Sequence, residues 1–220
     1  MSSTTMPEKI RINQPLIEDD DIAAVKDCIE DGQISGNAPI IEDFEKEFPA
    51  FIGRKHAIYV ANGTIAANLI VRSLFDLYFG SARHISRRGM RLNVPSISMA
   101  TPTLAAHDFL KGTVISHDVN INTFCSEGFR NIGAYDFTMI IHPYGVMRDP
   151  IIINGNKGNH ENRLSDKLII EDFSEAIGSF DKNGVKAGTI GNVSFCSLYA
   201  NKTITSGEGA MIFTDDDDVY

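Results

Sequence analysis

The segment that decides the fold is SLYANKTITSGEG, residues 197–209, near the end of the 220-residue chain. An apolar, strand-like run at residues 193–198 leads into it, and a second such run follows at residues 210–214. Lys202 lies in a Gly-rich turn between the two runs, so we expect it at the rim of a sheet. A lysine there can reach a cofactor aldehyde. The alternative is a solvated loop lysine, which is the ordinary interpretation of a lone lysine.

The rest of the sequence alternates apolar runs with helical patterns. Helices are predicted over residues 18–32, from Pro39 to a kink or end at Pro49, and over residues 64–79 and 103–110, with a helical turn at 174–177. Strands are predicted at residues 56–61, 92–95, 113–118, 138–142, 167–172, 193–198 and 210–214. Such apolar strands with short crossovers indicate an α/β fold, with a mostly parallel seven-stranded sheet and helices on both faces.

The same pattern predicts the domain organisation. Residues 1–15 form an N-terminal arm and residues 16–220 one large domain, in which the polar residues 151–166 form a surface loop. Thr214 is followed by four aspartates, which is typical of the start of a helix. We therefore expect that a further, smaller domain normally follows residue 220.

Composition excludes several classes of function. The net charge is −9, and clustered Lys/Arg is lacking, so we expect no nucleic-acid partner. The sequence has no apolar run of 18 residues and no secretory leader, so we expect a cytoplasmic protein without a membrane partner. The three cysteines, at positions 28, 125 and 196, have neither disulfide-framework nor zinc-site spacing, so we expect no metal.

Two other segments suggest what Lys202 does. Asn62-Gly63-Thr64 joins a strand to a helix N-terminus, where free N–H groups favour a phosphate, although many such turns bind no ligand. Asp172 ends a buried strand, where a carboxylate can pair with the pyridine nitrogen of pyridoxal phosphate or merely cap the next turn. The Ser197 hydroxyl can join the phosphate. Together these residues predict a pyridoxal phosphate site.

Other cofactor motifs are lacking. The sequence contains neither G-x-x-x-x-G-K-[ST] nor H-E-x-x-H. The glycines of GVKAGTIG, residues 184–191, do not follow a strand and open a helix as a dinucleotide-binding turn requires. An NAD-dependent sugar oxidoreductase is therefore the third hypothesis.

Several blocks, in this order, resemble one family. They are ISGNAPIIEDFEKEFPAFIGRKHAIYVANGT, NVPSISMAT, IIEDFSEAIGS and GTIGNVSFCSLYANKTITSGEGAMIFT. They are similar to the pyridoxal phosphate-dependent nucleotide-sugar aminotransferases of the DegT/DnrJ type, and most of all to the branch of GDP-perosamine synthases. The resemblance runs from about residue 14 to the end. It implies a fold type I large domain, then a smaller C-terminal domain, working as a homodimer.

The resemblance also implies roles for individual residues. Lys202 is the Schiff-base lysine and proton shuttle, and Asp172 pairs with the pyridine nitrogen. Glu175, where most members have Gln, lies near the ring hydroxyl. Met99 takes the position of an aromatic residue that stacks on the ring. The phosphate is bound by Gly63, Thr64 and Ser197, and the strand end His142-Pro-Tyr-Gly145 lies near the cofactor.

Two functional hypotheses follow from the resemblance. In the first, glutamate donates its amino group and a nucleotide-linked 4-keto-6-deoxy sugar receives it. Lys202 argues against a dehydratase, since the family's dehydratases have histidine at that position. In the second, the chain is a truncated, catalytically impaired member that keeps the fold and at most binds pyridoxal phosphate or a nucleotide sugar.

Overall fold

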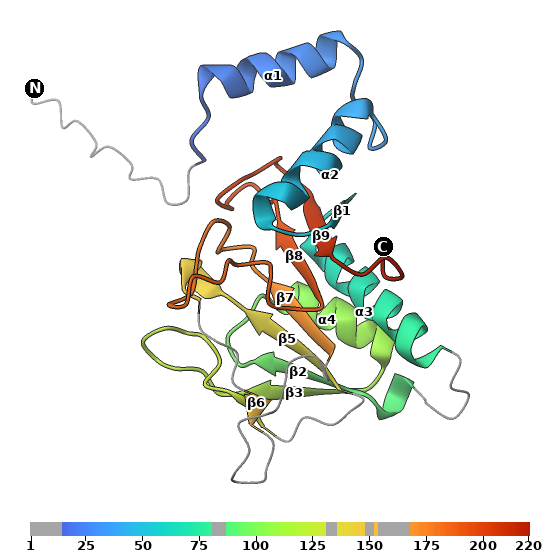
Figure 1. Ribbon diagram of the computed structural model, residues 1–220, viewed down its shortest axis with the longest axis vertical. Coiled ribbons are helices and arrows are strands. Elements are labelled where there is room, and N and C mark those ends of the chain that lie inside the picture. The colour runs from blue at the N-terminus through green and yellow to red at the C-terminus, as the bar shows by residue number, and fades with distance from the viewer. Residues whose placement is uncertain (1–14, 81–86, 131–135, 148–151, 154–167) are drawn as a thin grey trace, which may run out of the picture.

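The computed structural model describes residues 15–80, 87–130, 136–147, 152–153 and 168–220 (Figure 1). Their main feature is a seven-stranded sheet with the order β1-β9-β8-β7-β5-β2-β3. β9 runs antiparallel to its neighbours β1 and β8, and every other pair in this sheet is parallel. The strands are β1 (His56–Val60), β2 (Arg91–Pro95), β3 (Thr113–His117), β5 (Phe137–Ile141), β7 (Leu168–Asp172), β8 (Val193–Ser197) and β9 (Ala210–Thr214). The predicted mostly parallel seven-stranded sheet is therefore confirmed.

The helices also follow the predicted order. They are α1 (Asp19–Glu30), α2 (Pro39–Ile52), α3 (Gly63–Phe79) and α4 (Ala100–Leu110), with short 3-10 turns η1 (Arg87–Gly89) and η2 (Pro143–Gly145). A separate parallel pair joins β4 (Phe129–Arg130) to β6 (Ile152–Ile153). No described helix is both long and apolar enough to pass through a bilayer.

Two local predictions need correction, at helix α2 and at the C-terminal residues. Helix α2 does not end at Pro49 but continues to Ile52, because Phe48 and Ile52 are buried against the sheet, and it stops at Gly53, whose φ is 98°. At the predicted helical turn of residues 174–177, the structure has two short turns over residues 174–178. Residues 217–219 form one turn, closed by a 3.1 Å hydrogen bond from the N–H of Tyr220 to the carbonyl of Asp216. The predicted arm at residues 1–15 and the predicted loop at residues 151–166 lie almost entirely outside the described residues.

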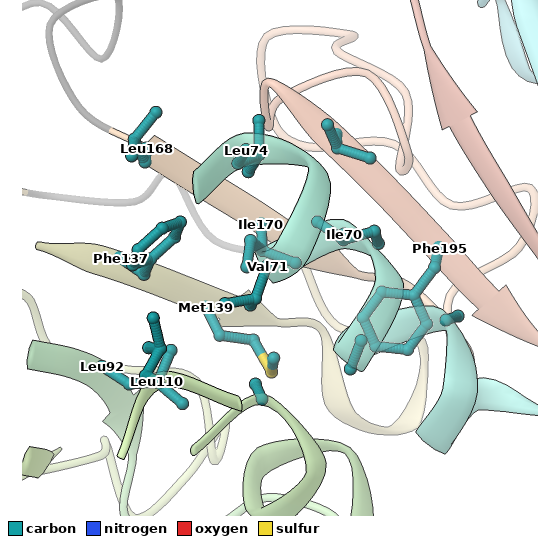
Figure 2. Close-up of a cluster of buried hydrophobic side chains, with 14 of the residues drawn as sticks. Ile70, Val71, Leu74, Leu92, Leu110, Phe137, Met139, Leu168, Ile170 and Phe195 are labelled. Carbon is teal, nitrogen blue, oxygen red and sulfur yellow. The ribbon is translucent and has the colours of Figure 1, made fainter. Parts of the chain in front are cut away.

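Helices cover both faces of the sheet. Helices α3 and α4 pack on one face, and Figure 2 shows the core between them and the strands, with Ile70 and Leu74 of α3 over Met139 and Ile170. Helix α2 packs on the opposite face, where Phe48 and Ile52 meet Phe213. Helix α1 has no buried residue and stands apart from the sheet (Figure 1).

The alternation of side chains along the central strands positions the functional groups. On β7, Leu168 and Ile170 belong to the core beneath α3, whereas Ile169 belongs to a cluster on the other face. Because side chains alternate with a period of two, Asp172 lies on the α3 face and Glu171 on the opposite face. The same rule places Ser197, two residues after the buried Phe195 of β8, on the α3 face.

Candidate active site

The start of helix α3 forms one wall of the site. The side chain of Asn62 caps the helix by accepting a hydrogen bond from the N–H of Ile65 at 3.0 Å. Gly63 and Thr64 are the first two helical residues, whose N–H groups have no partner within a helix. A Cβ atom at Gly63 would lie 3.4 Å from the Cβ of Ser197, so any larger side chain would fill the space between helix and strand. Helix N–H groups and two hydroxyls beside an open space suit a phosphate.

These residues surround a cavity of about 280 Å³. Its lining includes six of the predicted cofactor and catalytic residues, namely Gly63, Thr64, Met99, Asp172, Ser197 and Lys202. Glu175 lines an adjoining cavity of about 210 Å³, together with His142, Pro143 and Tyr144 of the predicted strand end. This cavity shares Met99, Asp172, Ser174 and Lys202 with the first. The complete lining of the larger cavity is Asn62, Gly63, Thr64, Met99, Thr101, Pro102, Asp172, Ser174, Phe195, Ser197, Tyr199, Lys202 and Glu208.

Asp172 presents a buried carboxylate to both cavities. Its Oδ1 accepts hydrogen bonds from the N–H and the hydroxyl of Ser174, at 3.0 and 2.5 Å. Within the described part of the chain, its Oδ2 accepts no hydrogen bond from the protein. Burial raises the pKa of Asp172 above its ordinary value, although hydrogen bonds from Ser174 and the charges of Lys202 and His142 oppose this shift. One oxygen thus caps a turn, as the alternative interpretation predicted, while the other remains available to a ligand.

Lys202 approaches the cavities from the turn after β8. Its side chain is only 10% exposed, and its Nζ lies 3.2 Å from Oε1 of Glu175. The other Glu175 oxygen accepts a 2.9 Å hydrogen bond from the N–H of Tyr144. Burial raises the pKa of Glu175, but the bonds from Tyr144 and Lys202 outweigh it and bring the pKa below its ordinary value. The structure therefore holds the Lys202 amine next to an ionised carboxylate at the rim of the cavity.

Met99 differs from the other predicted residues because it is largely exposed. It precedes α4, has 60% of its surface accessible and lines both cavities. A thioether at this position can pack on the face of a planar ring. The structure thus brings together all seven predicted residues around two adjoining cavities.

Sequence reasoning did not find Ser174, Tyr199 and Glu208. Ser174 joins two strand ends, because its hydroxyl donates to Asp172 and accepts a 2.8 Å hydrogen bond from the N–H of Ser197. A serine two residues after a strand-terminal aspartate is a usable turn signal. Tyr199 and Glu208 are brought to the cavity by the turn around Lys202, and no sequence pattern marks them.

Comparison with known proteins places this geometry in a family. The sequence profile of the DegT/DnrJ/EryC1/StrS aminotransferase family matches residues 15–220. The chain is 31% identical over 211 residues to the GDP-perosamine synthase of Vibrio cholerae, covering 94% of this chain and 53% of that protein. It is 30% identical over 226 residues to the GDP-perosamine synthase of Caulobacter vibrioides, covering 96% and 53%. The chain thus spans about half the length of the curated relatives it matches.

A solved structure supports the fold. The Escherichia coli GDP-4-keto-6-deoxy-D-mannose-3-dehydratase with bound hydrated PLP superimposes with a TM-score of 0.70, at 22% identity, over 94% of this chain and 51% of that one. At this identity the similarity shows a shared fold alone. The family match over residues 15–220 agrees with it, and the chain therefore belongs to the DegT/DnrJ/EryC1/StrS aminotransferase family.

Proposed function

We propose that this chain is the large-domain portion of a pyridoxal phosphate-dependent nucleotide-sugar aminotransferase. The observation that carries the proposal is the convergence of Lys202, the open Oδ2 of Asp172 and the start of helix α3 on one cavity. Pyridoxal phosphate, when bound, supplies an aldehyde that carries amino groups and a protonated pyridine ring that acts as an electron sink. The cavity offers a matching group for each end of that molecule.

The residues divide the work by their chemistry. The helix start at Gly63 and Thr64, with the Ser197 hydroxyl, binds the phosphate. The Asp172 carboxylate accepts the pyridine N–H. Lys202 would hold the aldehyde end of the cofactor through its amine, and the same amine is the group that could hold or move a proton there.

Two further residues orient the ring. Glu175 stands beside Lys202 and would face the ring hydroxyl of a bound cofactor, and the Met99 thioether would pack on the ring face.

The family match and the two synthase relatives support a nucleotide-linked sugar as substrate. We propose a 4-keto-6-deoxy sugar as amino acceptor and glutamate as donor. Lys202 favours amino transfer over dehydration, the activity in the name of the superimposed E. coli protein, because a lysine amine can hold the aldehyde covalently. The alternative is a catalytically impaired member that keeps the fold and at most binds pyridoxal phosphate or a nucleotide sugar, and binding without turnover is a defined outcome of the test.

We also propose a cytoplasmic homodimer. Exposed apolar side chains occur at the cavity and along the helices that begin beside it: Ile65, Leu69, Met99, Leu104 and Tyr199. A second copy of the chain can cover such a surface. Sedimentation velocity on the purified chain tests the homodimer, and a compact monomer at all concentrations would contradict it.

All three cysteines are free thiols, which fits a reducing compartment such as the cytoplasm.

Cofactor trapping tests the function. The protein is incubated with pyridoxal phosphate, treated with borohydride and mapped by mass spectrometry. We expect one reduced adduct, on the peptide that contains Lys202, and its loss in Lys202→Ala but not in Lys186→Ala. Lys186 is the matched control, because it lies over the rings of Phe51 and Phe180 and lines neither cavity. Formation of 2-oxoglutarate from glutamate and a GDP-linked keto sugar then separates turnover from binding. An adduct without turnover favours the impaired form, and no adduct rejects the proposed function.

A further inference from the structure

The smaller of the two adjoining cavities is not accounted for by the proposed cofactor. Its volume is about 210 Å³, and four of its lining residues, Lys202 among them, also line the larger cavity. The residues that line the smaller cavity alone are Ile97, Ser98, Ile141, His142, Pro143, Tyr144 and Glu175. Because the groups that suit pyridoxal phosphate line the larger cavity, the smaller one is a space in which a second reactant can reach Lys202.

One part of this lining is apolar. It consists of four side chains, called here the apolar wall: Ile97, Ile141, Pro143 and Tyr144. Polar side chains of the same cavity already have partners within the protein, since Ser174 bonds Asp172 and His142 bonds Glu171. A hydroxyl group held against aliphatic or aromatic carbon loses its hydration without gaining a hydrogen bond, whereas a methyl group gains from the same contact.

Tyr144 is fixed at this cavity by its backbone. Its φ and ψ are 54° and 28°, in the left-handed region that a tyrosine rarely adopts. In this conformation its N–H donates to Oε2 of Glu175 at 2.9 Å, and Oε1 of Glu175 lies 3.2 Å from the Nζ of Lys202. One carboxylate thus joins the Tyr144 backbone to the Lys202 amine. Strained backbone of this kind is concentrated at binding and active sites.

A second segment of the chain supports the Tyr144 ring. The ring of Phe124 meets it edge to face, with the centroids 5.9 Å apart and an angle of 75° between the planes. Phe124 also has a left-handed backbone, with a φ of 56°. The thiol of the next residue, Cys125, donates to the carbonyl of Val146 at 3.4 Å. The Tyr144 ring, although 73% of the residue is exposed, therefore has a supporting neighbour beside the cavity.

We propose that the apolar wall binds the methyl group of the acceptor sugar, and that Tyr144 thereby selects 6-deoxy sugars over sugars with a hydroxymethyl group at carbon 5. The inference rests on the proposed function, which supplies the 4-keto sugar. Carbon 6 is attached to carbon 5, the neighbour of the reacting carbon 4. A sugar whose carbon 4 reacts beside Lys202 therefore brings its methyl group within reach of the wall. The nucleobase is separated from the sugar by a diphosphate, so it is not the group that Tyr144 contacts.

Two nucleotide sugars that differ only at carbon 6 provide the test. GDP-D-mannose has a hydroxymethyl group at carbon 5 and GDP-D-rhamnose has a methyl group, and neither has the keto group that the reaction needs. We measure both dissociation constants by isothermal titration calorimetry on the full chain saturated with pyridoxal phosphate. The unaltered chain should bind GDP-D-rhamnose about 10- to 100-fold more tightly, the range over which apolar pockets discriminate such groups. Equal affinities overturn the proposal.

Variants of Tyr144 show whether its ring is responsible for the preference. Tyr144→Asn removes the ring but suits the left-handed backbone, so the two affinities should become nearly equal. Tyr144→Phe keeps the ring and should keep the preference. Phe180→Asn is the matched control, since Phe180 is 59% exposed and lines neither cavity. An undiminished preference in Tyr144→Asn overturns the role of Tyr144. If that variant does not fold, Ile97→Ser adds a hydroxyl to the same wall and should also reduce the preference.

Cofactor trapping distinguishes this inference from the proposed function. A chain that forms the borohydride-reduced adduct on Lys202 but binds neither nucleotide sugar overturns the sugar subsite alone. A chain that forms no adduct rejects the proposed function, and the assignment of the apolar wall to a keto sugar is rejected with it.

Discussion

Glu171 and Asp172 are adjacent carboxylates at the end of one buried strand, yet the two faces of the sheet give them opposite properties. On one face, Glu171 accepts four hydrogen bonds, three from backbone N–H groups and one from His142. Burial raises its pKa, but these bonds outweigh burial and bring the pKa below its ordinary value. On the other face, Asp172 has Ser174 as its hydrogen-bond donor, and burial raises its pKa.

The difference shows which carboxylate of this strand stabilises the fold and which one is available to a ligand. A saturated buried carboxylate stabilises the fold, because each donor around it would otherwise be buried without a partner. A buried carboxylate with an open oxygen costs stability and is retained where a ligand completes it. The same strand end therefore carries a structural group on one face and a candidate cofactor ligand on the other.

Removing the structural carboxylate should have the largest effect. Glu171→Ala leaves three loop N–H groups and His142 without their acceptor, so we expect a loss of about 3–5 kcal/mol in the free energy of unfolding. Urea denaturation followed by circular dichroism measures it. Asp172→Asn is the matched control and should stay within about 1 kcal/mol of the unaltered chain. Equal losses of unfolding free energy in the two variants would contradict the proposed difference between the two faces of the sheet.

A methyl group at Gly191 should destabilise the loop of residues 188–191, whose N–H groups bind the Glu171 carboxylate. A Cβ atom there would lie 2.8 Å from the carbonyl oxygen of Val193 and 3.0 Å from the backbone N of Glu171. Because those atoms belong to the sheet and cannot move away, Gly191→Ala should cost about 1–3 kcal/mol in thermal or urea unfolding. Gly36→Ala is the control, since its Cβ would meet nothing within 4 Å. A tolerated Gly191→Ala would mean that the loop shifts readily away from Glu171.

The pH dependence of stability should have opposite signs for the two carboxylates. The folded pKa of Glu171 is lowered, so its stabilisation is present above its unfolded pKa of about 4.3 and is lost as the pH falls through the folded value. The folded pKa of Asp172 is raised, so its contribution is present below its unfolded pKa of about 3.9 and is lost as the pH rises through the folded value.

Two variants reveal these signs by urea unfolding across the acidic range. Relative to the unaltered chain, Glu171→Gln should become less stable as the pH rises, and Asp172→Asn should become more stable. Each unit of difference between folded and unfolded pKa contributes about 1.4 kcal/mol. Parallel profiles for the two variants would contradict the assignment of opposite shifts.

The smallest effect concerns Ser174, which links the strand ends on the functional face. Ser174→Ala removes the donor to Asp172 and the acceptor of the Ser197 N–H, so we expect a loss of about 1 kcal/mol in unfolding free energy. Pyridoxal phosphate binding should weaken at the same time, because the Asp172 carboxylate loses its closest hydrogen bond. Ser73→Ala, at a helix position that lines neither active-site cavity, is the control. Equally weakened pyridoxal phosphate binding in both variants would show that Ser174 has no specific role in the site.

Local sequence patterns were sufficient to predict the strands and the edge of the sheet that carries both Lys202 and Asp172. Apolar runs bounded by turn residues mark all seven strands, and ligand groups in α/β folds gather beyond the carboxyl ends of strands. The end of α2 was mispredicted, because burial of Phe48 and Ile52 outweighs the hydrogen bond that Pro49 cannot make. The turn predicted around residue 175 is present, and Ser174 at its start bonds the strand-terminal carboxylate.

The glycines of residues 184–191 show most clearly what could not be predicted from the sequence. The sequence argued against a dinucleotide turn at these glycines but indicated no other role for them. Only the folded chain brings Gly188 and Gly191 against Glu171, where side chains would collide with Phe173, Val193 and the strand itself.

The sequence by itself determined the strands, their mostly parallel arrangement and the edge that gathers Gly63, Thr64, Asp172, Ser197 and Lys202. The period-two alternation of a strand and the bonding capacity of each residue type are local properties, so they can be read from the chain. The tertiary structure alone decided which of two neighbouring carboxylates is saturated and which keeps an open oxygen. Donors from loops some twenty residues away make that choice, because a carboxylate's charge and availability depend on its surroundings in space.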